Sequence, residues 1–154
     1  MSRLDYRNAL LYGSPKHLLD RLQKVQHNAA RLIYLSSKFN NVTPPLHTAH
    51  WLPIEKKRID FKLTSLCFKS LNGSAPTYLS DLLHLYTPSR QLRSSADTRV
   101  FRVPSFRTKS RGQCSFSYQA PTTWNQLPAS IRHASSVSSF KSSLKTLLFS
   151  VPLP

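Results

Sequence analysis

Apolar residues recur at steps of three and four between Ser14 and Leu35, a spacing that is typical of an amphipathic helix. Ser14 and Pro15 suit an N-cap and the first helical position. We therefore predict a helix here with one core-facing stripe, formed by Leu18, Leu22, Val25, Ala29 and Leu32.

Prolines and an Asn-Gly pair divide much of the remaining chain into shorter helices, because proline suits a first helical turn and Gly73 suits a helix end. Pro121 is expected to interrupt a helix. Ser138 is expected to cap the last helix, with Phe140, Leu144, Leu147 and Leu148 facing inward. The predicted helices span about 45–50, 53–71, 76–86, 116–120, 121–127, 128–133 and 138–148.

Helical periodicity disappears from Thr87 to Arg111. Residues 100–103 and 105–108 predict two short strands, which Pro104 limits to edge or irregular strands. The predicted fold is therefore mainly α: a small helical domain of about five to seven helices with a short irregular β element in the Arg-rich middle.

A length of 154 residues suits one domain, or two small lobes that share a core. The changes in pattern predict an N-terminal leader at 1–15, a helical lobe at 16–86 and a basic loop or β segment at 87–112. A C-terminal helical part at 113–150 and a tail at 151–154 complete the expected organisation.

Charge narrows the class of partner. The 22 Lys and Arg residues against 6 Asp and Glu residues give a net charge of +16, which favours RNA or DNA, and more rarely an anionic membrane. The sequence contains no apolar run of the roughly 20 residues that a membrane helix needs, and its first residues do not resemble a signal peptide. We therefore expect no membrane partner and an intracellular chain, in the nucleus or cytoplasm and not secreted. Cys67 and Cys114 are expected to be free thiols.

Catalytic patterns are sparse. The six acids are never adjacent, whereas two-metal chemistry needs convergent carboxylates. His47 and His50 could share a helical face, but zinc would need further ligands and the chain has no CxxC pair. With 3 glycines, a phosphate-cradling loop is not expected. The sequence thus predicts no enzyme, no cofactor and no metal site.

The best functional candidate is the basic segment, because guanidinium groups suit phosphates and the neighbouring Phe101 and Phe106 could stack on unpaired bases. The alternative is a solvated basic loop with both Phe residues buried. Trp51 and Trp124 are better explained as core residues than as base platforms. The predicted nucleic-acid-binding residues are Arg90, Arg93, Arg99, Arg102, Arg107, Lys109 and Arg111, with Lys24 and Arg31 on the first helix as a second, weaker group.

Several sequence motifs, taken in order, resemble those of a known family. The stretch from Leu22 to Ile33, LQKVQHNAARLI, resembles the signature that follows the polymerase domain in reverse transcriptases of LINE-type, jockey-like retrotransposons. Later landmarks keep the same order, so the resemblance extends from about Lys16 to Phe149. They are Thr43-Pro44, 50–54, 58–63, 75–79, 86–90, 92–95, Ala120-Pro121, Trp124-Asn125, Leu127-Pro128, Phe140-Lys141, Leu144-Lys145 and Leu148-Phe149.

The resemblance implies a parent RNA-directed DNA polymerase, with the remainder of that reverse transcriptase as a partner. The polymerase's paired-aspartate motif is absent from this chain. The expectation is therefore a non-catalytic accessory segment that holds RNA or a primer–template duplex, in a truncated or decayed copy. The alternative is a structural fragment that packs on the polymerase thumb and has no activity of its own.

Overall fold

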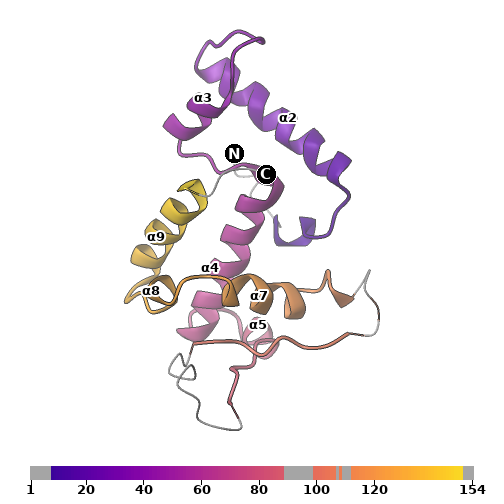
Figure 1. Ribbon diagram of the computed structural model, residues 1–154, viewed down its shortest axis with the longest axis vertical. Helices are drawn as coiled ribbons and strands as arrows, with labels where there is room; N and C mark the ends of the chain where they lie inside the picture. The colour runs from indigo at the N-terminus through magenta and orange to yellow at the C-terminus, as the bar shows by residue number, and fades with distance from the viewer. Residues whose placement is uncertain (1–7, 89–98, 107, 109–111, 151–154) are drawn as a thin grey trace. The chain divides into compact units, whose positions relative to one another are not determined.

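A computed structural model describes residues 8–88, 99–106, 108 and 112–150, and it confirms a mainly α-helical fold. The chain forms two compact units: unit 1 is Met1–Phe61 with Lys145–Pro154, and unit 2 is Lys62–Leu144. The helices labelled in Figure 1, together with two shorter helical segments, η1 and η2, are η1 Asn8–Leu11, α2 Lys16–Ile33, α3 Thr43–Thr48, η2 Ile54–Arg58, α4 Ile59–Leu71, α5 Thr77–Ser80, α7 Phe116–Asn125, α8 Ala129–Arg132 and α9 Val137–Ser150.

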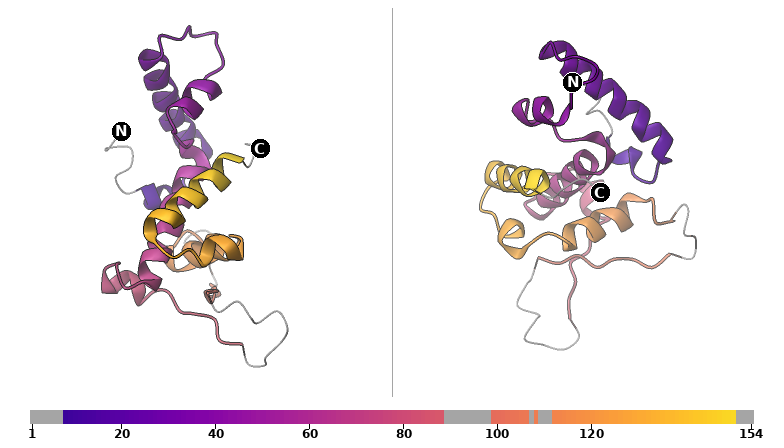
Figure 2. Two further views of the ribbon diagram at one scale, coloured as in Figure 1. Left: turned by 90° about the vertical axis from the view of Figure 1, so that its left-hand side faces the viewer. Right: turned by 45° about the horizontal axis from the view of Figure 1, so that its top comes forward.

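In unit 1, helix α2 lies beside α3, and the two are joined by the loop that follows α2 (Figures 1 and 2). Ala30 of α2 forms a buried cluster with Val42 and Leu46, and Trp51 packs against that cluster. The predicted inward stripe of α2 is wrong. Its buried residues are Gln26 and Ala30, whereas Leu18, Val25 and Leu32 are exposed.

Hydrogen bonds explain why a polar residue lies on the buried face of α2. The Gln26 side chain donates to the Leu52 carbonyl (2.9 Å) and accepts from Gln23 Nε2 (3.0 Å). Gln23 Oε1 in turn accepts from the backbone N–H of Ile54 (2.7 Å). Because a buried amide costs little once its groups are paired, two glutamines attach α2 to the segment that leads into η2.

Helices α2, α3 and α4 all end in the same way, with a residue in the left-handed region. That residue is Gly73 after α4, as the Asn-Gly pair predicts, but it is Leu35 after α2 and His50 after α3, with φ of 47° and 51°. Each end is closed by the long-range bond of a Schellman motif. These bonds run from the N–H groups of Ser36, Trp51 and Ser74 to the carbonyls of Arg31, Leu46 and Lys69, respectively.

Unit 2 is built around an aromatic core. Phe68 of α4 stacks on Phe140 of α9 with ring centroids 4.3 Å apart, and Trp124 of α7 lies 5.7 Å from Phe140. All three are buried, as are Leu63 and Cys67 on α4. Trp124 is thus a core residue, as the sequence predicts.

Several predicted helix boundaries are wrong. The helix expected at 76–86 is only the single turn α5, since the chain beyond it becomes extended. Pro121 lies inside α7 and does not interrupt it. A proline removes only one backbone N–H from the helix, and the burial of Pro121 favours a continuous helix despite that loss. Ser136, and not Ser138, caps α9, accepting from the N–H of Ser139 (3.1 Å). The helix predicted from Pro53 is present but opens as the π-helical η2.

Candidate nucleic-acid interface

The predicted basic segment is only partly covered by the described residues. Arg99 and Arg102 lie within them. The remaining predicted residues, Arg90, Arg93, Arg107, Lys109 and Arg111, lie outside the described residues.

The backbone around Arg102 pairs with the chain that follows α5. Leu85 and Phe101 form an antiparallel β-bridge, supported by bonds from Tyr86 N–H to Val100 O (2.8 Å) and from Arg102 N–H to His84 O (2.8 Å). Of the two strands predicted at 100–103 and 105–108, the described residues form only the isolated bridge at Phe101. Pro104 has no N–H to donate, which is consistent with the predicted irregularity.

Phe101 serves the core rather than a nucleic-acid base. It is buried, and its ring meets Trp124 edge-on at 5.8 Å. The Asn125 side chain holds its backbone from both sides, accepting from the Phe101 N–H (3.0 Å) and donating to the Phe101 carbonyl (2.8 Å). The bridge and these two hydrogen bonds therefore fix the backbone next to Arg102.

Arg99 is hydrogen-bonded to residues of both α7 and α8 in unit 2. Its guanidinium Nη1 donates to the Arg132 carbonyl (3.0 Å), while its own carbonyl accepts from Trp124 Nε1 (2.8 Å) and Arg132 Nη1 (3.4 Å). Such reciprocal bonds link the basic segment to α7 and α8. Removing Arg99 would therefore disturb the fold as well as any phosphate contact.

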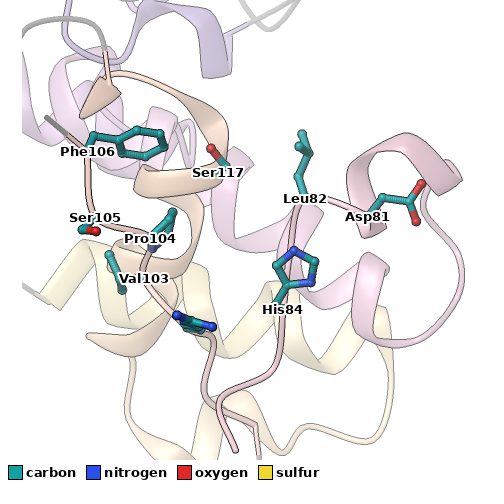
Figure 3. A pocket seen from close by; sticks show the side chains of 9 residues that line it. Asp81, Leu82, His84, Val103, Pro104, Ser105, Phe106 and Ser117 are labelled. Carbon is teal, nitrogen blue, oxygen red and sulfur yellow. The ribbon is translucent and has the colours of Figure 1, made fainter. Parts of the chain in front are cut away.

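Arg102 is exposed at a pocket of about 460 Å³ in unit 2. Figure 3 shows Val103, Pro104 and Phe106 on one side of this pocket and Leu82 and His84 on the other. Asp81 contributes a carboxylate and Ser117 of α7 a hydroxyl to the lining. A cation beside apolar walls can hold a phosphate and a base face together.

Phe106 is half exposed at this pocket and meets the ring of Tyr118 edge-on at 6.1 Å. Gly112 makes this position possible. A Cβ atom on Gly112 would lie 2.5 Å from Phe106 Cβ, closer than side-chain atoms approach. The sequence offered one signal for this contact: a glycine in a chain with only 3 of them.

The second predicted group lies on α2 in unit 1. Lys24 is exposed and available to solvent, as are Lys16 and Arg21. Arg31 is half-buried, and its Nε is buried without a hydrogen-bond partner. Lys24 therefore fits a phosphate contact better than Arg31 does.

A polar site in unit 1 was not predicted. Gln23 Nε2 lies 2.7 Å from His27 Nε2, and burial, followed by the nearby Arg31 cation, lowers the pKa of His27. His27 lines a small pocket of about 160 Å³ with Trp51, Lys57 and Phe149, among others. Burial also lowers the pKa of Lys57. The spacing of apolar residues along the sequence does not predict a buried polar site of this kind.

Both cysteines are free thiols, as expected. Cys114 is exposed, while burial raises the pKa of the Cys67 thiol well above its usual range. Within the described ranges, no three His, Cys, Asp or Glu side chains gather closely enough to hold a metal ion. None of the helices in those ranges has the length and apolar character needed to cross a membrane.

Comparison with known proteins gave no match: no family model, curated protein or solved structure is significantly similar to this chain.

Proposed function

We propose that this chain is a non-catalytic nucleic-acid-binding accessory segment of a LINE-type retrotransposon reverse transcriptase, in a truncated or decayed copy. The observation that carries the proposal is the surplus of 22 cations over 6 acids. The ordered resemblance from Lys16 to Phe149 supplies the family. The role implies RNA or DNA and the rest of the reverse transcriptase as partners, and a location in the nucleus or cytoplasm.

The mechanism is electrostatic positioning. Cations of the basic segment meet phosphates, which releases counterions and gives affinity with little base specificity. Arg102 supports this role because it is exposed beside the apolar wall of the unit 2 pocket. Of the two Phe residues in the basic segment, Phe106 remains open to a base, since Phe101 is buried.

The test is binding of the purified chain to structured RNA, single-stranded DNA and duplex DNA, followed by fluorescence anisotropy across a salt series. The variant Arg102→Gln with Arg107→Gln should lower the log–log salt slope by about 1.4 on single strands and about 1.8 on duplex. Arg99 is left intact because of its structural bonds.

The matched control is Lys62→Gln with Lys141→Gln, which removes the same charge from exposed positions on α4 and α9. An equal loss of slope in the control would show that binding is diffuse and not centred on the basic segment. Absence of binding at low salt by the folded chain would refute the proposal. A primer-extension assay is expected to show no polymerase activity.

One observation favours a second candidate, a structural segment that packs against the rest of a reverse transcriptase. Large apolar residues are exposed along α2 and the loop after it, including Leu32, Leu35 and Phe39. Exposed apolar surface of this extent marks interaction sites. This candidate predicts that the chain alone binds apolar surfaces and has low solubility.

A further inference from the structure

The exposed face of α2 has the spacing of a helix–helix seam. Leu18, Val25 and Leu32 repeat every seven residues, with Leu22 and Ala29 between them at steps of four and three. This is the alternation of the two core positions in a coiled coil. Leu18, Val25 and Leu32 are 41%, 54% and 78% exposed, so the seam is open in this structure.

The seam is separate from the face that α2 uses inside unit 1. Gln26 and Ala30 are buried there, and Gln23 and Gln26 make the hydrogen bonds to the segment before η2. A helix that is already held on one face by its own unit, and has a second apolar face, is suited to a further partner.

The charges beside the seam indicate the chemistry of the partner. We propose that this face of α2 docks an amphipathic helix whose apolar stripe is edged by acidic residues. On a helical projection, Arg21 borders the seam, whereas Lys24 and Arg31 lie about 120° and 140° from its centre, on the far face of α2. The opposite border carries Ile33, which is exposed, and then Gln26, which is held within unit 1. An acidic residue on the edge of the incoming helix would complement Arg21.

Two other occupants suit this face less well. A second copy would bring two chains of +16 together and set their cations against each other. A helix that lies on an anionic membrane buries bulky residues such as Trp, Phe and Leu across its apolar face. The α2 seam includes the small Ala29 and has no aromatic residue, which suits close packing against another helix.

The test uses the full chain and a helical peptide of about three heptads, with Leu at its seam positions and Glu at its borders. A twin peptide carries Lys in place of Glu. We expect the Glu peptide to bind about tenfold more tightly or better. Arg21→Glu should shift the preference toward the Lys twin.

The variant Val25→Gln with Leu32→Gln should weaken binding of the Glu peptide about tenfold or more, with unchanged circular dichroism, because both residues are exposed. The matched control, Tyr78→Gln with Leu82→Gln, alters two exposed apolar residues of unit 2 and should bind normally. RNA binding should persist in the Val25 and Leu32 variant, so failure of this proposal is distinguishable from failure of the nucleic-acid role.

Three results would overturn the proposal. The first is equal binding of the Glu peptide by the Val25 and Leu32 variant and the original chain. The second is that the seam binds vesicles of phosphatidylcholine with about one quarter phosphatidylserine but neither peptide, which would make it a membrane face. The third is dimerisation in light scattering that the same variant abolishes, which would make a second copy the occupant.

Discussion

The two units bury their interiors by different means. Unit 2 packs Phe68, Trp124 and Phe140 against one another, with centroids 4.3 to 6.5 Å apart. Unit 1 holds α2 through Gln26, which is fully buried, and Gln23, with a small apolar cluster around Ala30. The first arrangement depends on filled volume and the second on satisfied hydrogen bonds.

The two units are therefore sensitive to different kinds of substitution. An aromatic core loses stability in proportion to the volume that a substitution removes. A buried amide network loses stability when one partner is deleted, because the remaining groups stay buried without a bond. Substitutions in each unit test this contrast. The buried thiol of Cys67 reports on the opening of unit 2, because a thiol reagent reaches it only when the core is exposed.

The largest effect is expected for Trp124→Ala. It removes the ring between Phe101 and Phe140 and the bond to the Arg99 carbonyl, and should lower the free energy of unfolding by about 3–5 kcal/mol. Urea denaturation followed by circular dichroism measures the loss, and labelling of Cys67 by a thiol reagent should accelerate. Trp124→Phe should cost less, since a ring remains. Similar losses for both variants would mean that the hydrogen bond, and not the volume, dominates.

An intermediate effect is expected for Gln26→Leu, a change that adds apolar character at a buried site. The substitution leaves the Leu52 carbonyl and one Gln23 donor unpaired, so the free energy of unfolding should fall by about 1–3 kcal/mol. The control Gln126→Leu, at an exposed position, should change it by less than about 0.5 kcal/mol in the same urea titration. A stabilised Gln26→Leu variant would contradict the hydrogen-bonded account of unit 1.

The smallest effect concerns pH. Burial and then Arg31 lower the pKa of His27 in the folded chain. Between that lowered pKa and the usual value of about 6.5, the unfolded chain binds more protons, so stability falls as pH decreases through this window. The urea midpoint should drop from pH 7.5 to pH 5.5, and His27→Gln should reduce the drop. Identical pH dependence in the two chains would exclude His27 as a contributor.

Sequence periodicity predicted the helices well where propensity and packing agree. The extent of α2, the end of α4 at Asn72 and Gly73, and the burial of Trp124, Phe140 and Leu144 were all expected. It failed on the orientation of α2, because apolar spacing marks a face suited to packing but does not say what packs there. Two glutamines occupy the face that the fold buries.

Other errors have equally local causes. The helix expected after Pro76 stops early because Leu85 pairs with Phe101, a partner distant in sequence. Proline rules predicted a break at Pro121, but Pro121 lies on the buried face of α7 together with Ala120 and Trp124, and tertiary packing overrides the local preference.

Among the residues of the predicted basic segment, the structure distinguishes the roles of Arg99, Arg102 and Phe101. Composition identified the basic segment but could not separate a guanidinium that braces the fold, at Arg99, from one exposed beside a pocket, at Arg102. It also could not tell that Phe101 is buried and Phe106 is not. Those distinctions depend on tertiary contacts with α7.

The left-handed residues that end α2 and α3 are places where the protein can be stabilised. Leu35 and His50 occupy a left-handed backbone conformation that costs a side-chain-bearing residue about 1–2 kcal/mol, whereas Gly73 avoids that cost. The chain thus holds removable strain at two exposed positions, outside both of its cores. Of the two, His50 lies apart from the α2 seam. Substituting His50 by Asn or Gly is therefore the first change to try for a more stable protein for crystallisation.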